Sequence, residues 1–101
     1  MSTDAGSPAS AFDADRPWRL DDRVAVRPEP FGALLYHFGT RRLSFLKDPM
    51  LLAVVQRLAD HPSARAACES AGVGASAMPA YERALGTLAD SAMIAVREPG
   101  R

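Results

Sequence analysis

Three short segments in the first half of the chain carry the hydrophobic pattern of β-strands. They cover residues 23–27 (RVAVR), 34–38 (LLYHF) and 42–47 (RLSFLK). Alternating apolar and polar side chains predict strands that bury one face, and Pro28-Glu29-Pro30 ends the first of them. Gly39-Thr40 separates the second and third segments. We therefore expect a hairpin there, with Gly39 in the positive φ that a tight turn needs.

The pattern changes to a helical period at Asp48. An aspartate followed by Pro49 is typical of a helix N-cap with proline in the first turn. Ser63 and Ser76 are expected to cap two further helices, and Gly72 to end the second. We therefore predict helices at residues 49–60, 63–71 and 77–90. Three strands followed by three helices with short connections predict an α+β domain of winged-helix type, with a three-stranded antiparallel sheet.

The ends of the chain differ from its middle. Residues 1–16 are rich in Ser, Ala, Gly, Pro and Asp without any periodicity, so we expect a disordered tail. Residues 17–97 should form one domain, since about a hundred residues build a single modest core, and residues 98–101 should fray. Trp18 and Leu20 are expected to pin the first ordered segment to the core. Met93 to Val96 reads as a short last strand or as a trailing end.

Charge is balanced overall but unevenly distributed. Twelve basic and twelve acidic side chains cancel, and this argues against a nucleic-acid binder. Residues 16–47 nevertheless hold seven basic and three acidic side chains. This excess favours an acidic partner, although a solvated strand face would explain it too. One cysteine, an N-terminus without a signal-like apolar core, and no apolar run long enough to cross a membrane predict a cytoplasmic protein.

Candidate catalytic chemistry is scarce. His37 and His61 are far apart in the sequence and neither has a second ligand at metal-binding spacing, so we expect no metal site. Cys68 falls on the inward, small-residue face of its helix, where it serves better as core filler than as a nucleophile. Acidic residues form no evident acid–base pair. We expect no catalytic residue, no cofactor and no enzymatic activity.

Two non-catalytic functions remain. A winged helix could place its third helix in the major groove of DNA as a transcriptional regulator, but that helix offers Glu82 and Asp90 beside Arg83, the wrong charge for a polyanion. Alternatively, the third strand is an open edge that accepts an extended peptide as an added strand. The basic side chains near the hairpin agree with the second interpretation.

Three segments of the chain resemble the MftB family, the chaperone-like proteins of mycofactocin biosynthesis. They are VRPEPFGALLYHFGTRRLSFLKDP, LLAVVQRL and YERALGTLADSAMI, and the resemblance spans roughly residues 16–97. It implies a relative of PqqD and of other elements that recognise ribosomally made, modified peptides. It further implies a monomeric, non-catalytic protein that binds the leader of the acidic precursor peptide MftA. The bound precursor is presented to MftC, the radical S-adenosylmethionine enzyme that modifies its C-terminal Val-Tyr.

The resemblance also implies a binding site, because in such relatives the leader lies between the third strand and the third helix. Carried onto this chain, the strand contributes one continuous segment and the third helix one apolar face. The apolar helix residues could equally serve the core. The expected peptide-binding residues are Arg41, Arg42, Leu43, Ser44, Phe45, Leu46, Met78, Tyr81, Leu85 and Leu88.

Overall fold

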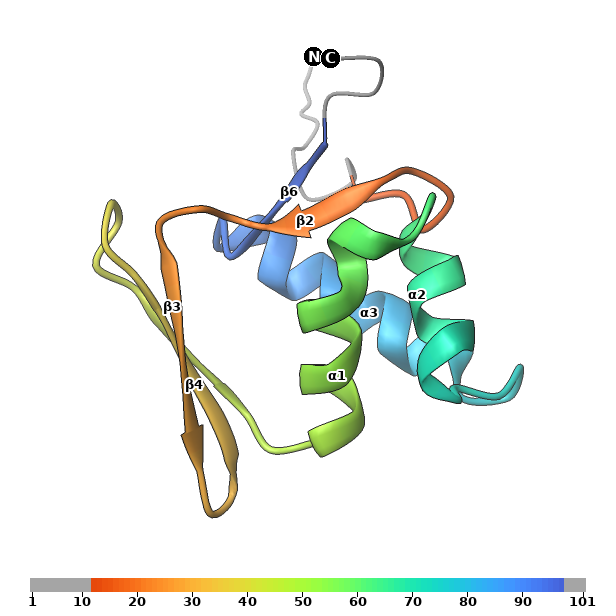
Figure 1. Ribbon diagram of the computed structural model, residues 1–101, viewed down its shortest axis with the longest axis horizontal. Helices are drawn as coiled ribbons and strands as arrows, with labels where there is room; N and C mark the ends of the chain where they lie inside the picture. Colours follow the sequence, from red (N-terminus) through yellow and green to blue (C-terminus); the bar gives the residue numbers. More distant parts are fainter. Residues whose placement is uncertain (1–11, 98–101) are drawn as a thin grey trace, which may run out of the picture.

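The computed structural model describes residues 12–97 and contains two small sheets and three α-helices (Figure 1). The order of elements confirms the predicted α+β class, with strands near the start and helices after them. The elements are β2 (Trp18–Leu20), β3 (Val24–Glu29), β4 (Gly32–His37), β5 (Leu43–Leu46), α1 (Pro49–Arg57), the 3₁₀ helix η2 (Leu58–Asp60), α2 (Ala64–Ala71), α3 (Met78–Asp90) and β6 (Ile94–Val96).

The larger sheet has three antiparallel strands in the order β3-β4-β5, as predicted. Its register pairs Val24 with His37 in one hairpin and Ala33 with Leu46 in the other. A second sheet joins β2 to β6, with Trp18 opposite Val96. The possible last strand at Met93 to Val96 is therefore confirmed, and it closes the domain beside its first strand. The α+β class is thus confirmed, whereas the likeness to a winged helix stays a prediction.

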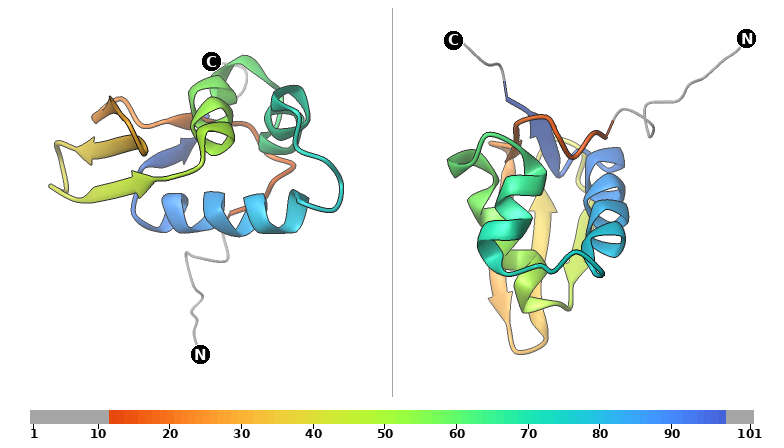
Figure 2. Two further views of the ribbon diagram at one scale, coloured as in Figure 1. Left: turned by 90° about the horizontal axis from the view of Figure 1, so that it is seen from below. Right: turned by 90° about the vertical axis from the view of Figure 1, so that its right-hand side faces the viewer.

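The core lies between the larger sheet and the helices, all of which cover the same face of that sheet (Figures 1 and 2). Strand β4 alternates strictly, so that Ala33, Leu35 and His37 are buried while its other side chains face outward. Buried residues of α1, α2 and α3 complete the same cluster. This arrangement leaves the opposite face of the sheet uncovered by any helix in residues 12–97.

Two of the three predicted helix caps are confirmed. Asp48 accepts a hydrogen bond from the Met50 N–H at the start of α1, and Ser63 accepts one from the Ala66 N–H at the start of α2. Gly72 ends α2 with φ of 102°, as a left-handed C-terminal glycine should. The cap expected at Ser76 was wrong. A backbone turn from Gly74 already leads into α3, so Ala77 takes the cap position without a side-chain hydrogen bond.

Residues 12–16, expected to lie in the disordered tail, contact the domain instead. The carbonyl oxygens of Ala14 and Arg16 accept hydrogen bonds from Arg65 and Ala64. These two amides open α2 and have no partner within the helix, so the incoming chain satisfies them. The Trp18 indole N–H donates to the Asp13 carbonyl at 2.8 Å. The rest of the expected tail, residues 1–11, and the expected frayed end, residues 98–101, lie outside the described residues.

Candidate functional site

Strand β5 is an open edge of the larger sheet. It pairs only with β4 among residues 12–97, because β6 pairs with β2 in a separate sheet. Strand β3 is the other edge, but Pro28 removes one of its backbone donors and blunts it. Strand β5 contains no proline. The sequence-based expectation that the third strand has a single neighbour is thus confirmed for the part of the chain that the structure describes.

The register fixes which backbone groups of β5 are free. The His37 N–H donates to the Arg42 carbonyl at 3.0 Å, which marks a hydrogen-bonded position of the β4–β5 pair. Hydrogen-bonded and non-hydrogen-bonded positions alternate in an antiparallel pair. Ser44 and Leu46 therefore direct their N–H and C=O groups toward β4. Leu43 and Phe45 direct theirs away from the sheet, where they can bond an added strand.

Strand β5 and helix α3 lie along the same side of the molecule (Figure 2, left). A groove runs beside this edge, with walls from both elements. One cavity of about 360 Å³ takes its walls from both elements and from α1, and a second of about 120 Å³ continues it along α3. Leu51 and Ala84 line both cavities, so the two form one continuous groove. The groove is lined by Ser44, Phe45, Leu46, Asp48, Leu51, Ala80, Tyr81, Ala84, Thr87 and Leu88.

The groove contains only part of the expected helix site. Tyr81 and Leu88 line it, although Leu88 is only 4% exposed and also belongs to the core cluster. Leu85 is fully buried, Met78 is 8% exposed, and both belong to the core without lining the groove. The groove-facing residues of α3 that the sequence analysis missed are Ala80, Ala84 and Thr87. Their spacing of four and three residues marks a helical stripe next to the bulky apolar one. That helical spacing could have identified these residues from the sequence. Alanine and threonine are too small and too weakly apolar, however, to stand out as a hydrophobic stripe.

The expected strand residues divide between two faces. Ser44 and Leu46 face the groove, whereas Leu43 lines a separate hollow on the opposite face of the sheet. Phe45 borders the groove from the edge and is 61% exposed. Arg41 and Arg42 are exposed at the hairpin that precedes β5. The structure thus places the ten expected residues in four environments, namely the groove, the core, the exposed hairpin and the opposite face of the sheet.

Tyr81 supplies a polar contact in the otherwise apolar groove. Its hydroxyl donates to the Asp48 carboxylate, which also caps α1. The hydrogen bond to Asp48 raises the pKa of Tyr81 above its ordinary value, because it stabilises the protonated hydroxyl that donates the bond. This bond joins α3 to the start of α1. It therefore fixes the separation of the elements that form the groove.

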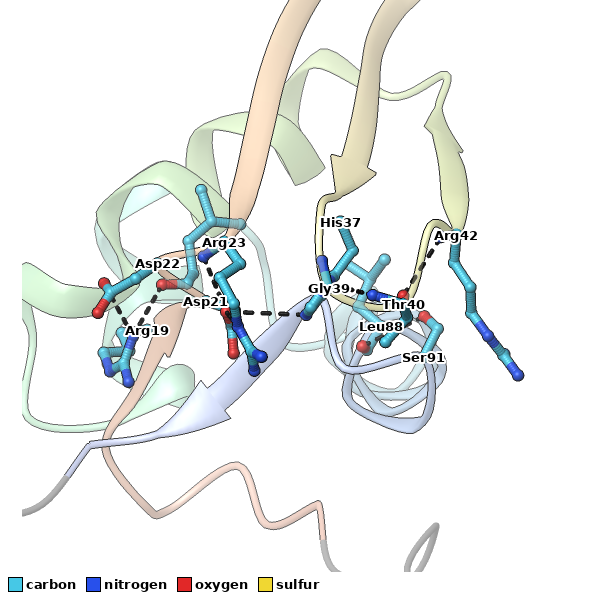
Figure 3. A network of polar contacts seen from close by, with 11 residues as sticks. Arg19, Asp21, Asp22, Arg23, His37, Gly39, Thr40, Arg42, Leu88 and Ser91 are labelled. Atoms are coloured by element: carbon cyan, nitrogen blue, oxygen red, sulfur yellow. Dashed lines mark hydrogen bonds and ion pairs between the residues drawn. The ribbon is translucent and has the colours of Figure 1, made fainter.

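The hairpin carrying the two arginines is built around a buried histidine (Figure 3). His37 Nδ1 accepts hydrogen bonds from the Gly39 and Thr40 N–H groups at 2.9 and 3.0 Å. The Arg41 N–H donates to the His37 carbonyl, and Arg41 adopts a φ of 65°. The expectation that Gly39 has the positive φ was therefore wrong. Arg41 takes that conformation because bonds to His37 hold the loop from within.

The other ring nitrogen of His37 lies near a carboxylate but has no hydrogen-bond partner among the described residues. This atom, Nε2, lies 3.7 Å from Asp21 Oδ1, which also accepts the Arg23 N–H at 2.9 Å (Figure 3). The backbone hydrogen bond from Arg23 lowers the pKa of Asp21 below its ordinary value, against the opposing effect of burial. The segment before β3 and the hairpin after β4 are thereby connected.

Reactive groups outside this region are few among the described residues. In residues 12–97, no three His, Cys, Asp or Glu side chains lie close enough together to hold a metal ion. Burial raises the pKa of the Cys68 thiol, which disfavours the reactive thiolate. No helix of the described chain is long and apolar enough to cross a bilayer. The open edge and its groove remain the best-formed candidate site.

A free strand edge beside an apolar groove places the chain in a class of proteins whose architecture suits the binding of extended peptides. Comparison with known proteins agrees with this class. The family model for the peptide chaperone MftB family matches residues 17–95. A peptide chaperone MftB from Mycobacterium ulcerans (strain Agy99) is 61% identical over 94 residues, which cover 93% of this chain and 86% of the relative. A peptide chaperone MftB from Mycobacterium tuberculosis (strain ATCC 25618 / H37Rv) is 60% identical over 90 residues, which cover 89% of this chain and 83% of the relative.

The chain therefore belongs to the peptide chaperone MftB family, as its sequence segments suggested. A third relative of the same name, from Mycolicibacterium smegmatis (strain ATCC 700084 / mc(2)155), is 57% identical and covers 87% of this chain and 86% of its own length. No solved structure matches the chain significantly. Family membership supports a peptide chaperone role and a non-catalytic protein.

Proposed function

We propose that this protein binds the leader of the precursor peptide MftA as a fourth strand on β5 and presents the precursor to the radical S-adenosylmethionine enzyme MftC. It performs no chemistry of its own in this proposal and acts as a monomer. The cytoplasm is the proposed compartment, supported by the lone and buried Cys68. The observation that carries the proposal is the free edge of β5, open beside the groove that α3 lines.

Backbone hydrogen bonds supply the general part of the binding. Leu43 and Phe45 each offer one N–H and one C=O to an incoming strand, four groups in total, and they lie in adjacent outward positions of β5. Each such bond contributes a net of about 0.5–1.5 kcal/mol. Because these bonds do not depend on side chains, they fix the path of the leader and leave its selection to the groove and to the basic side chains at the ends of β5.

The groove supplies selection by shape. An added strand points alternate side chains toward α3, where Leu51, Ala84 and Leu88 form an apolar floor. Small Ala80 and Ala84 on α3 leave space that larger residues would fill. Apolar leader residues spaced two apart therefore fit this side. The groove's length along α3 accommodates more than one such residue.

Basic side chains at the two ends of β5, which we call the rim, supply selection by charge. Arg41 and Arg42 are exposed at the start of β5, and no ion pair occupies either of them within residues 12–97. Lys47 is exposed at the other end of the strand. Basic side chains at both ends attract an acidic peptide and disfavour a basic one. The acidic character expected of MftA matches this distribution.

The test fills the groove without changing its charge. In Ala84→Phe, the ring occupies space between α3 and β5, so affinity for a synthetic MftA leader should fall by about tenfold or more, as for a blocked interface centre. Ala75→Phe places the same ring at an exposed position in the loop before α3 and should bind as the unmodified protein does. Titration calorimetry measures both, with duplex DNA as a separate titrant and thermal unfolding as the folding control.

Equal leader affinity of the folded Ala84→Phe and Ala75→Phe variants would exclude the groove as the binding site. Binding of duplex DNA with loss of leader binding would replace the proposal with the regulator function. Leader binding without any association with MftC would retain the strand-addition part and remove the presentation part.

A further inference from the structure

The face of the larger sheet that points away from the helices carries a large apolar surface. We call it the outer face. It is formed by Leu34, Tyr36, Phe38, Leu43 and Phe45, together with Phe31 in the turn between β3 and β4. Phe38, Phe45, Leu43 and Phe31 are 62%, 61%, 53% and 45% exposed. A hollow of about 440 Å³ lies in its middle, between β3, β4 and β5. Contiguous exposed apolar surface of this kind marks an interaction site.

The fold itself does not require these side chains. The core cluster is formed by the opposite face of the sheet, from Ala33, Leu35 and Leu46. On the outer face the rings contact one another instead. Tyr36 and Phe38 pack edge to face at 5.1 Å between centroids, and Phe31 and Phe45 lie 6.0 Å apart. These pairs hold the rings in fixed positions and keep an apolar surface ready for a partner.

Charge on the rim of the outer face indicates what kind of partner fits. Arg27 lines the hollow, and Arg41 and Arg42 stand at the hairpin end of the sheet, all three exposed. Arg27 forms an ion pair with Glu29 at 3.5 Å, whereas Arg41 and Arg42 form none within residues 12–97. Two copies packed face to face would bring these arginines together, which like-charge repulsion opposes. An apolar surface rimmed by carboxylates is complementary to them.

The outer face is continuous with the proposed peptide edge. Leu43 and Phe45 contribute their side chains to the outer face and their outward backbone groups to that edge. A strand added to β5 would point every second side chain toward α3 and the others onto the outer face. A partner covering the outer face would therefore touch the bound peptide as well as the chaperone.

We propose that the outer face docks the enzyme that receives the peptide, through an apolar patch with an acidic rim on that enzyme. The inference rests on the proposed function, since it assigns a surface to the presentation step. It assigns the two partners to neighbouring surfaces that meet at β5. The leader occupies the edge and the groove, and the enzyme occupies the side of the sheet opposite the helices.

The experiment uses MftC as the probe and measures three quantities independently for each folded variant. They are the affinity for MftC, the affinity for the MftA leader and the sedimentation coefficient of the chaperone alone. Phe31→Ser/Phe38→Ser removes two exposed rings from the two turns of the outer face, neither of which lines the groove. Met50→Ser removes an apolar side chain that is exposed elsewhere, and it serves as the matched control.

The double variant should bind MftC about tenfold more weakly or worse, as loss of aromatic anchors does, with leader affinity and sedimentation unchanged. MftC affinity equal to that of Met50→Ser would overturn the proposal. So would loss of leader binding in the double variant, which would make the outer face part of the peptide site. A lower sedimentation coefficient in the variant would identify the face as a contact between copies. If the unmodified protein binds the leader but not MftC, both the docking surface and the presentation step are wrong, and leader binding stands.

Discussion

Replacing Phe45 by proline tests strand addition at the backbone. In the register described above, the Phe45 N–H points away from β4, so proline removes a donor of the free edge without removing a bond of the sheet. The proline ring also occupies the space into which that N–H would donate. An edge strand tolerates proline where its N–H faces solvent. The variant should therefore fold while losing capacity for an added strand.

The expected magnitude follows from the number of bonds affected. One hydrogen bond is removed and its neighbour across the added strand is displaced, at a net of about 0.5–1.5 kcal/mol each. The sum, about 1–3 kcal/mol, corresponds to a loss of roughly 5- to 150-fold in affinity. Phe45→Ala is the necessary control, because it removes the same ring and keeps the N–H. The comparison of the two variants isolates the backbone contribution.

Fluorescence anisotropy with a labelled MftA leader measures both affinities, and thermal unfolding checks that each variant is folded. The reasoning predicts that Phe45→Pro binds at least about fivefold more weakly than Phe45→Ala. Equal affinities would refute it, since a peptide held only by side chains would not detect the missing donor.

Three further predictions concern the rim, the sheet and the hairpin. Arg41→Ala/Arg42→Ala should weaken leader binding by roughly twofold to thirtyfold at low salt and by less in 1 M salt. The loss should come mainly from slower association, which stopped-flow traces measure. An equal loss of affinity at both salt concentrations, caused by faster dissociation, would contradict this electrostatic role. Gly32→Ala places a Cβ 2.0 Å from a β5 carbonyl oxygen at a φ of 146°, so the free energy of unfolding should fall by about 1–3 kcal/mol or more. Gly74→Ala, where a Cβ meets nothing within 4 Å, should change it little, and similar losses in both would be inconsistent with this account. Asp21→Asn should lower the free energy of unfolding by about 1–2 kcal/mol at pH 7. The folded-state pKa of this carboxyl is lowered from 3.8, so the difference in free energy of unfolding between the variant and the unmodified protein should shrink as pH falls below that value. Urea unfolding at pH 7 and pH 2.5 measures this difference. A difference that stays constant between the two pH values would count against the role of Asp21.

The local elements of this fold could be predicted from the sequence because each is encoded by neighbouring residues. Alternation in β3, β4 and β5, the Asp48 and Ser63 caps and the Gly72 stop all act within a few positions. The edge character of β5 also followed, since no later segment offered it an evident partner. These features depend on local backbone chemistry, and the structure reproduces them.

The groove could not be predicted in the same way because it depends on how separate elements pack. The sequence analysis listed the bulky residues Met78 and Leu85 for the peptide and left open that they serve the core. Both are buried in the core, and small Ala84 faces β5 instead. The hairpin shows the same limit. Hydrogen bonds to His37 hold Arg41 in a positive φ. Gly39, which the sequence analysis expected in that conformation, therefore does not adopt it.

Amide hydrogen exchange along β5 tests the central claim most directly. The sheet already protects the Ser44 and Leu46 amides, whereas those of Leu43 and Phe45 are free. Saturation with the MftA leader should slow exchange at Leu43 and Phe45 and change Ser44 and Leu46 much less, an alternation that only an added strand produces. Unchanged exchange at Leu43 and Phe45 in the saturated complex, with protection on another element, would contradict strand addition at this edge.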